Sequence, residues 1–424
     1  MSERLVIVDG IRTPFCKMGT SLATLGADEL GRVAVNALLL RTGLDPALVD
    51  EVIFGCVAQP VDAANVSRVI ALRAGIPQSV PAMTVHRNCA SGFEAFTTAY
   101  ERMNAGRGSI FIVGGAESMS QVPLLFKQSA ANKFAGLQRA KSILQKLGAF
   151  GAFRPGDFAP RIGLKLGLTD PVSGLNMGQT AEVLAREFAI SRGEQDAFAL
   201  RSHQRAVAAR EKLAEEITPV YVRGKAITED NGPRANQSIE ALADLRPFFD
   251  RKFGTVTAGN SSQITDGAVA LLVMTEKRAA ELGFTPLGRL AGYAYSGCDP
   301  KRMGLGPAFA VAKTERLPGL SIQQADIIEI NEAFAAQVIA VESLMKSDNF
   351  AQSMGLAHPI GEIPQEKLNV NGGSIALGHP VGATGARLIL TGLKELQRRN
   401  GKLAMLSLCV GGGQGAVVWL ERGG

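Results

Sequence analysis

The stretch HRNCASGFEAF (residues 86–96) places a cysteine between a short apolar run, AMTV, and a segment with helical spacing. A strand that leads directly into a helix is the repeating element of α/β domains. In the helical segment, Phe93, Phe96 and Tyr100 follow Cys89 at positions that share one helix face. The stretch therefore predicts an α/β fold, and it raises the question of why a thiol stands at the junction.

The same alternation of apolar runs and helical segments continues through both ends of the chain. RLVIVDG, DEVIFG, AMTV and SIFIVGG predict strands in the first part, and GRLAGYAY, ADIIEI and KLAMLSLC predict strands in the last part. Helical segments such as DELGRVAVNALLLRTG and GARLILTGLKELQRR stand between them. Because the order of segments is similar in both parts, the sequence predicts an internal duplication of one α/β unit.

Between these parts the strand signal fades. From residue 121 to 247, helical segments such as GQTAEVLAREFAI follow one another, and the later apolar run DGAVALLVM (266–274) predicts a strand that returns to the first sheet. We expect an N-terminal domain over residues 1–120 that is completed by 248–280. An inserted, mainly helical domain is expected over 121–247, and a C-terminal domain over 281–424.

Composition limits the possible functions. With 424 residues, 46% hydrophobic and 20% charged, the chain can bury a large core. Its net charge of +6 suits an anionic small molecule better than nucleic acid, which needs a concentrated basic face. The N-terminal residues lack a signal-peptide pattern, and no uninterrupted apolar span approaches about 20 residues. We therefore expect a cytoplasmic location.

The cysteines and histidines argue against disulfides and metals. The five cysteines at 16, 56, 89, 298 and 409 form no CxxC pair, which fits neither a disulfide framework nor a zinc site and favours a reducing compartment. The four histidines at 86, 203, 358 and 379 show no ligand spacing, so no metal is expected.

Four residues are candidates for chemistry, and each has a plainer alternative. Cys89 begins a helix, where free backbone N–H groups and the helix dipole favour a thiolate, although a buried cysteine is often only a small hydrophobic residue. His379 lies in a glycine-dense loop and suits a base or a loop hydrogen bond. Cys409 precedes three glycines at a strand end, where a tight turn is the alternative. Asn331 lies between a strand and a helix, where it suits a helix cap.

Taken together, the motifs resemble one family. NCASGF, GGAESMS, NEAFA, GGSIALGHPVGATG and CVGGGQG, in this order and spacing, resemble the thiolase family of acyl-CoA enzymes, and GTVTAGNSSQITDGA (254–268) and MGQTAE (177–182) match further thiolase motifs. RSHQRA and the stretch around AQSMGLAHPIGEIPQEKLNVNGGS are most similar to the thiolase subunit of the fatty-acid oxidation trifunctional complex. That subgroup usually has His where this chain has Asn331. The resemblance implies a duplicated five-layer αβαβα fold with an inserted loop domain.

The resemblance also implies a mechanism. Cys89, activated by His379, would attack the keto carbon of a 3-ketoacyl-CoA and keep the acyl group, and Cys409 would protonate the departing acetyl-CoA carbanion. The backbone N–H groups of Cys89 and Gly411 would bind the tetrahedral oxyanion, while His379 and a water held by Asn331 would bind the enolate oxygen. The reverse reaction, in which two acetyl-CoA condense, is the alternative direction.

Ligands and partners follow from the same resemblance. Coenzyme A would be a substrate rather than a bound cofactor, with Ser262 as a candidate contact. We expect the chain to form a homodimer or homotetramer. The resemblance to the trifunctional complex also suggests two further partners, a hydratase/dehydrogenase subunit and a membrane surface. Phe134, Leu137, Leu144 and Leu147 indicate an amphipathic helix. Eight basic residues accompany one acid, Asp157, between positions 121 and 168: Lys127, Lys133, Arg139, Lys141, Lys146, Arg154, Arg161 and Lys165. A solvated basic face, or a funnel for CoA phosphates, is the plainer interpretation.

A β-ketoacyl synthase and a non-catalytic lipid-binding protein are the two alternative functions. A β-ketoacyl synthase has a related duplicated fold, but it pairs its cysteine with two His, or His and Asn, and Cys409 in CVGGGQG argues against it. A non-catalytic thiolase-like lipid-binding protein would lack one of the catalytic residues, and all four candidates stand in this chain.

Overall fold

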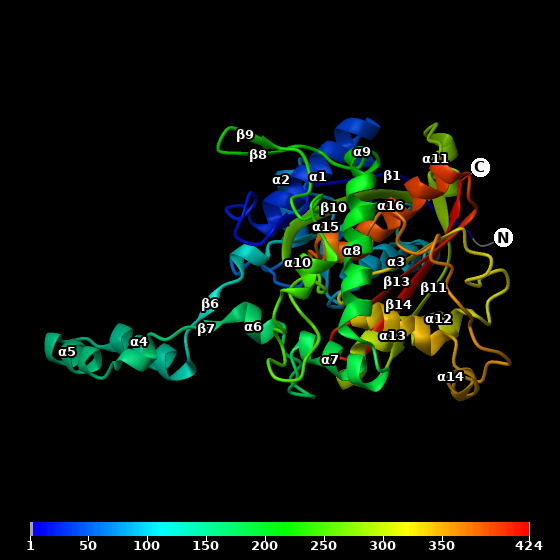
Figure 1. The fold of residues 1–424 in the computed structure, drawn as a ribbon. Coiled ribbons are helices and arrows are strands. Elements are labelled where there is room, and N and C mark those ends of the chain that lie inside the picture. The colour runs from blue at the N-terminus through cyan, green and yellow to red at the C-terminus, as the bar shows by residue number, and fades with distance from the viewer. Residues whose placement is uncertain (1–2, 424) are drawn as a thin grey trace. The chain divides into compact units, whose positions relative to one another are not determined.

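The computed structural model describes residues 3–423 (Figure 1). Its main β-structure is continuous and ten-stranded, and five of these strands form the sheet of the first half. Its strands are β1 (Leu5–Arg12), β3 (Glu51–Gly55), β4 (Ala82–Val85), β5 (Ile110–Glu117) and β10 (Thr265–Thr275), and the short β2 (Cys16–Lys17) pairs with the start of β10. The order is β4-β3-β5-β10-β1, with β3 parallel to β4 and β5, and β10 antiparallel to β5 and β1. The predicted return of residues 266–274 to the first sheet is confirmed.

A second sheet repeats this pattern. Its strands are β11 (Gly288–Gly297), β12 (Ile327–Ile330), β13 (Leu403–Val410) and β14 (Gln414–Arg422). β12 is parallel to β13, while β13 is antiparallel to β14 and β14 to β11. These strands therefore take the places of β3, β5, β10 and β1, so the predicted duplication is confirmed, although β14 was absent from the predicted strands. β1 and β11 pair only at Val6–Arg289 and Ile7–Gly288, where the two sheets join.

Two helices lie between the sheets. α3 (Ser91–Asn104) packs against β3 and β5, and α16 (Thr384–Arg399) packs against strands of both sheets. The first turns of the two helices meet so closely that a Cβ atom on Gly92 would clash with the backbone of Ala386. Because residue 89 precedes α3 and residue 379 precedes α16, this contact brings both loops to one place in the molecule.

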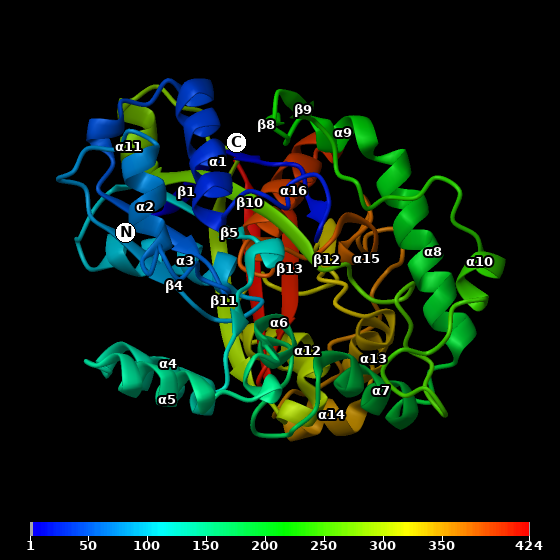
Figure 2. The same ribbon diagram turned by 90° about the vertical axis from the view of Figure 1, so that its left-hand side faces the viewer.

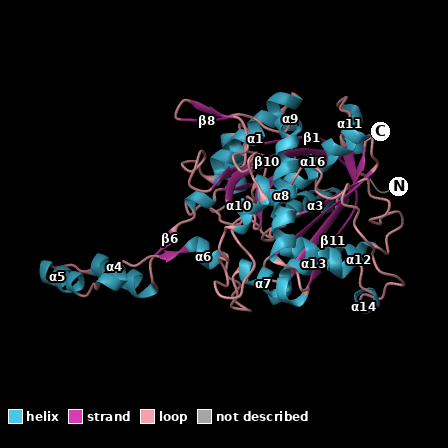
Figure 3. Cartoon of the chain, in the orientation of Figure 1, coloured by secondary structure: helices cyan, strands magenta, loops and turns pink. Residues whose placement is uncertain are grey.

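The outer faces of the sheets carry the remaining layers (Figures 2 and 3). α1 (Ala27–Thr42) and α2 (Val66–Arg73) cover the first sheet, and α12 (Gly306–Thr314) and α13 (Ala335–Met345) cover the second. β10 is buried along its whole length, which explains its continuous apolar sequence. The chain thus has the five-layer αβαβα arrangement. Short elements complete it: η1 (Pro46–Leu48), η2 (Met119–Gln121), α11 (Glu276–Glu281), η4 (Pro300–Leu305), α14 (Asp348–Ser353) and α15 (Ser374–Leu377).

The expected inserted region, 121–247, is divided between two compact units. Its second part contains α7 (Met177–Glu187), α8 (Arg192–Ala208), α9 (Arg210–Ala214), β8 (Val220–Val222), β9 (Lys225–Ile227) and α10 (Ile239–Ala243), and it belongs to the unit that holds both sheets. Phe198 and Ala199 of α8 are buried in the core of the second half. This burial ties residues 170–247 to the main unit, so only residues 122–169 separate from it.

The smaller unit, Val122–Thr169, is described by itself. It consists of the paired strands β6 (Leu124–Leu125) and β7 (Arg161–Ile162) with α4 (Gln128–Arg139), α5 (Ile143–Gly151), η3 (Pro155–Asp157) and α6 (Gly163–Gly167). The single amphipathic helix predicted through residues 134–147 is wrong. A capping box between Ser142 and Gln145 starts a new helix. It satisfies backbone N–H groups that, in one continuous helix, would bond to carbonyl groups of the preceding turn. Within residues 3–423, every helix is too short or too polar to cross a bilayer.

Candidate functional site

Cys89 lies in a tight turn between β4 and α3. β4 ends at Val85, α3 begins at Ser91, and the turn is closed by Ser91, whose Oγ donates to the carbonyl of Asn88 (2.7 Å) and accepts from the N–H of Arg87 (2.9 Å). The predicted position of the thiol at the start of a helix is therefore confirmed. Cys89 as a whole residue is half-buried, unlike the fully buried Cys409.

The local electrostatics of Cys89 differ from the simple helix-dipole expectation. Burial raises the pKa of its thiol, whereas the backbone N–H groups of Gly411 and of Cys89 itself lower it. The net direction is upward, so the start of α3 alone does not produce a thiolate, and the site needs a base. The two N–H groups that lower this pKa are those expected to form the oxyanion hole.

Cys409 comes from the other half of the chain. It is the penultimate residue of β13, opposite Gly415 of β14, and its side chain is fully buried. Burial raises the pKa of this thiol well above its usual value, and the nearby Cys89 raises it further. Cys409 is therefore protonated in the resting site, as a general acid must be. The effect of Cys89 on the pKa of Cys409 indicates that the two thiols lie close together.

The turn after Cys409 depends on glycine. Gly412 and Gly413 have φ angles of 89° and 83°, a region that residues with a Cβ atom rarely occupy. At Gly413 a Cβ atom would also clash with the carbonyl of Cys298. These constraints let a three-residue turn place the N–H of Gly411 beside the sulfur of Cys89.

His379 is held in one tautomer. Its Nδ1 lies 2.6 Å from the Oγ1 of Thr384, and that hydroxyl donates its own hydrogen to the carbonyl of Pro380 (3.1 Å). Because the hydroxyl hydrogen is used, Nδ1 must carry a proton and donate it to Thr384, which leaves a lone pair on Nε2. Nε2 is buried and has no hydrogen-bond partner among the described residues. A free, buried lone pair is what a base for Cys89 requires.

The environment of His379 keeps the imidazole neutral. Burial lowers its pKa to about 3, and the positive charge of Arg387 contributes in the same direction. Its backbone N–H donates to the carbonyl of Gln263 (3.0 Å) and to the Oγ1 of Thr265 (3.1 Å). His379 is therefore bound to the end of the GNSSQ loop, and it is available to accept a proton near neutral pH.

Glu117, at the end of β5, connects residues 57–58 to the loop that follows His379. Its buried carboxylate accepts the N–H groups of Val57 (3.1 Å), Ala58 (2.9 Å) and Gly382 (2.9 Å), and its charge acts on Cys89. Gly382 is three residues after His379, so Glu117 joins the two halves directly under the site. The GGAES motif marked this strand end in the sequence, but nothing local indicated which loop the carboxylate would hold.

Asn331 presents an unused amide donor. It lies between β12 and α13, its Oδ1 accepts from the hydroxyl of Ser374 (2.6 Å), and its backbone N–H donates to Ser407 (2.8 Å). Its Nδ2 is buried and has no partner among the described residues. The helix-cap alternative is excluded, because α13 begins at Ala335 with Phe334 as its N-cap. The free Nδ2 therefore suits a bound water or an oxyanion.

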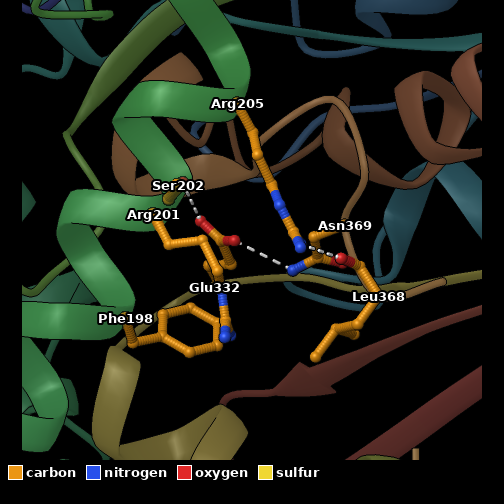
Figure 4. A pocket seen from close by; sticks show the side chains of 7 residues that line it. All are labelled: Phe198, Arg201, Ser202, Arg205, Glu332, Leu368 and Asn369. Atoms are coloured by element: carbon orange, nitrogen blue, oxygen red, sulfur yellow. Dashed lines mark hydrogen bonds between the residues drawn. The ribbon is translucent and has the colours of Figure 1, made fainter. Parts of the chain in front are cut away.

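The next residue, Glu332, anchors this loop from behind. Its carboxylate accepts hydrogen bonds from the Ser202 hydroxyl (2.6 Å) and the Asn369 amide (2.9 Å), as Figure 4 shows. It also accepts the N–H of Ile375 (3.2 Å). Figure 4 shows these groups from α8 and the 368–369 segment around one small pocket, on which Cys89 and Cys409 do not border. The pocket is therefore a packing feature that fixes the direction of Asn331 and is separate from the reacting groups.

Ser262 lies beside the same loop. Its backbone N–H donates to the carbonyl of Ala333 (2.9 Å), and the neighbouring Ser261 forms a bridge with Phe334. Phe334 and Cys409 belong to one apolar cluster, against which Met177 and Phe249 pack. The site thus has an apolar wall next to Cys409. Among residues 3–423, no group of three or more His, Cys, Asp or Glu side chains is arranged to hold a metal ion.

The chain matches two family models over nearly its whole length. The model "Thiolase, N-terminal domain" matches residues 5–277, and "Thiolase, C-terminal domain" matches residues 284–422. The 3-ketoacyl-CoA thiolases of Serratia proteamaculans and Yersinia enterocolitica are 42% and 40% identical to it, each alignment covering 99% of this chain and 97% of the relative.

Solved structures show the same likeness. The acetyl-CoA acetyltransferase of Bacillus anthracis has a TM-score of 0.85 and 37% identity, covering 99% of each chain. Human mitochondrial 3-ketoacyl-CoA thiolase in complex with CoA has a TM-score of 0.84 and 36% identity, covering 99% of this chain and 98% of that one.

Proposed function

This chain belongs to the thiolase family, and from that premise we propose that it is a 3-ketoacyl-CoA thiolase, an acyltransferase of fatty-acid β-oxidation. The observation that carries the proposal is the pairing of two cysteines from the two halves. The N–H of Gly411 lowers the pKa of the Cys89 thiol. The buried Cys409 lies close enough to Cys89 for a charge on Cys89 to raise the pKa of Cys409. One thiol is placed to attack and the other to deliver a proton, which is the division of labour that carbon–carbon cleavage needs.

The first half-reaction follows from these positions. Nε2 of His379 takes the proton of the Cys89 thiol, and the thiolate attacks the keto carbon of the substrate. The resulting oxyanion is stabilised by the N–H groups of Cys89 and Gly411. When the oxyanion collapses, the carbon–carbon bond breaks, the acyl group stays on Cys89, and Cys409 gives its proton to the carbon of the acetyl-CoA enolate. The enolate oxygen is stabilised by His379 and by a water held on the free Nδ2 of Asn331.

The second half-reaction restores the enzyme. The thiol of coenzyme A gives its proton to the Cys409 thiolate and attacks the acyl group on Cys89, and the proton held by His379 returns to Cys89 when the new thioester leaves. Each catalytic group thus regains its starting state, because the proton of coenzyme A replaces the one that Cys409 gave to the methyl carbon of acetyl-CoA. No bound cofactor takes part, since coenzyme A is itself a substrate.

The apolar wall beside Cys409 indicates where the pantetheine arm of coenzyme A would lie. Met177, Phe249 and Phe334 lie beside Cys409, and Ser262 borders the same loop. The pantetheine of coenzyme A is long and mostly apolar with two amides, so we place it along this wall with the Ser262 hydroxyl as a contact. A Ser262→Ala enzyme with an unchanged KM for coenzyme A would reject that contact.

The opposite net direction is a second candidate. The similarity to the Bacillus anthracis acetyl-CoA acetyltransferase favours a biosynthetic enzyme that condenses two acetyl-CoA. A comparison of kcat/KM for acetoacetyl-CoA and for longer 3-ketoacyl-CoAs separates the two: a degradative enzyme should use long substrates at least as well, whereas an acetyltransferase should accept only the four-carbon one. A purified protein that gives no acetyl-CoA with any of them would instead be a non-catalytic lipid-binding protein.

The smaller unit, Val122–Thr169, supports a docking role. In α5, Ile143, Leu144, Leu147 and Phe150 are between 66% and 84% exposed, and no residue of this helix is buried. Asp157, the one acid of the unit, pairs with Lys133 at 2.6 Å. Exposed apolar side chains among basic residues fit an anionic lipid surface, which attracts the charges and takes up the apolar groups. We therefore propose a peripheral membrane contact through this unit.

Replacing Lys133, Arg139, Lys141 and Lys146 by Gln tests the contact. Co-sedimentation with vesicles containing phosphatidylserine should fall, while neutral vesicles should bind the unchanged protein weakly. Unchanged sedimentation would overturn the proposal. If capture of a purified hydratase/dehydrogenase subunit falls instead, the unit docks on that partner, and if only the KM for coenzyme A rises, the unit guides the phosphates of the substrate.

Subunit number and location are also proposals. β4 is an edge strand, paired with β3 on one side only within the described residues, and such an edge supports pairing with a second copy. We propose a homodimer or homotetramer, which light scattering after gel filtration would measure. The five free cysteines support a reducing compartment, and hence the cytoplasm.

A further inference from the structure

Asn88 has an unusual backbone and a contact with the other half of the chain. Its φ angle is 43°, in the left-handed region that Asn tolerates better than most residues with a side chain. Its side-chain Nδ2 donates to the carbonyl of Gly411 at 2.8 Å. The residue immediately before Cys89 therefore holds the residue whose N–H reaches the sulfur of Cys89.

A second hydrogen bond supports the same contact. Nη1 of Arg87 donates to the side-chain oxygen of Gln414 at 3.3 Å, at the other end of the β13–β14 turn. Arg87 is itself oriented by Glu94, at 2.5 Å, and by the ring of Tyr295, whose centroid lies 4.1 Å from its guanidinium. Two consecutive residues before Cys89 thus bind the two ends of one turn.

The turn needs an outside contact because it is built from glycine. Residues 411–413 have no side chains to restrict rotation, and glycine is the residue with the most backbone freedom. Rotation about the bonds of Gly411 would turn its N–H away from Cys89 without breaking any strand pairing. A hydrogen bond to the carbonyl of the same residue restricts that rotation.

We propose that Asn88 is a positioning residue: its left-handed backbone aims Cys89, and its amide holds Gly411 so that the Gly411 N–H faces the sulfur. The inference rests on the proposed function, since the same N–H would bind the tetrahedral oxyanion. Asn is suited to both tasks, because Gly offers the backbone without the donor and Asp offers the backbone preference without the donor. Asn thus combines both properties in one side chain.

Three variants separate these properties. Asn88→Gly keeps the left-handed backbone and loses the amide, and Asn88→Asp replaces the donor by a carboxylate that repels the Gly411 carbonyl. Asn400→Gly is the matched control, because Asn400 also has a left-handed backbone (φ 57°), at the C-terminus of α16, and the substitution is the same. Thermal melting of each variant shows whether it is folded, and Asn88→Gly alone suffices if Asn88→Asp does not fold.

The measurement is the pH profile of Cys89 alkylation by iodoacetamide, read on the Cys89 peptide by mass spectrometry. The Gly411 N–H favours the thiolate, so both Asn88 variants should shift the profile to higher pH and slow alkylation at pH 7.5 by about twofold to tenfold. Acylation of Cys89 by acetyl-CoA should slow by a similar factor. The Asn400→Gly profile should coincide with that of the unchanged protein.

Two results would overturn the inference: coinciding profiles for Asn88→Gly and the unchanged protein, or an equal shift in Asn400→Gly. Alkylation requires no thiolase turnover, so the experiment decides the role of Asn88 even if the protein fails to cleave a 3-ketoacyl-CoA. That failure would reject the proposed function and leave the Asn88 result standing.

Discussion

Thr384→Val tests the most specific feature of the site, the single tautomer of His379. Valine has nearly the shape of threonine, so the packing is preserved, but the acceptor for the Nδ1 proton is lost. The imidazole then has an unpaired buried donor, because a methyl group replaces the hydroxyl that accepts the Nδ1 proton at 2.6 Å in the unchanged protein. The tautomer with the proton on Nε2 becomes more favourable, and in that form the nitrogen facing the site cannot accept the proton of Cys89.

The size of the effect follows from the hydrogen bond. Leaving a buried donor unsatisfied costs about 1 to 3 kcal/mol, which corresponds to roughly a fivefold to 150-fold lower population of the active tautomer. We therefore expect kcat for cleavage of acetoacetyl-CoA with coenzyme A to fall by a factor in this range. The KM should change less, because the Nδ1 contact does not touch the substrate.

Two control variants make the result interpretable. Thr384→Ser retains the hydroxyl and should keep activity within about threefold of the unchanged enzyme. Thr314→Val removes a comparable buried hydroxyl, which accepts the indole N–H of Trp419 at 2.9 Å, and it should lower the melting temperature with no loss of kcat per folded molecule. If Thr384→Val is folded and as active as Thr384→Ser, the tautomer argument is refuted.

Further expectations concern the other site residues. Cys89→Ala should form no acyl-enzyme, whereas Cys409→Ala should still be acylated by acetyl-CoA but should cleave the carbon–carbon bond slower by several powers of ten. Mass spectrometry after incubation with acyl-CoA checks both variants. If Cys89→Ala carries an acyl adduct that turns over, the assignment of roles to the two cysteines is wrong. In steady-state kinetics, Asn331→Ala should lower kcat about tenfold with a smaller change in KM. Asn331→His should retain substantial activity. An inactive His variant would mean that thiolases with Asn and those with His at this position form the contact in incompatible ways. The pKa of His379 is lowered to about 3 in the folded protein against about 6.5 when unfolded, so the unfolded chain binds more protons in this range and stability falls as the pH drops through it. Between pH 6 and 5 the unchanged protein should lose about 1 kcal/mol more unfolding free energy than His379→Asn in urea titrations, and equal slopes would contradict the burial of a neutral imidazole.

Local sequence patterns were sufficient for most of the secondary structure. β10 and α3 depend on apolar spacing that lies within a dozen residues, so their positions could be predicted. The division of residues 121–247 could not, because it depends on where α8 is buried, and that burial involves Phe198 and residues of the second half more than 100 positions away. The break between α4 and α5 is marked in the sequence by Ser142 and Gln145, whereas the apolar spacing alone predicts a continuous helix.

The motifs by themselves indicated the residues that we propose for the site. Cys89, His379, Cys409 and Asn331 each stand at a strand end or helix start, and a parallel α/β arrangement brings such ends together. Only the tertiary structure decided their chemical states. Burial reverses the helix-end effect on Cys89, and Thr384 selects the tautomer of His379. Ser374 binds the amide oxygen of Asn331, and the amide nitrogen is left without a partner among the described residues. The reason is physical: a pKa and a hydrogen-bond partner depend on desolvation and on groups from both halves of the fold, which no local pattern of residues contains.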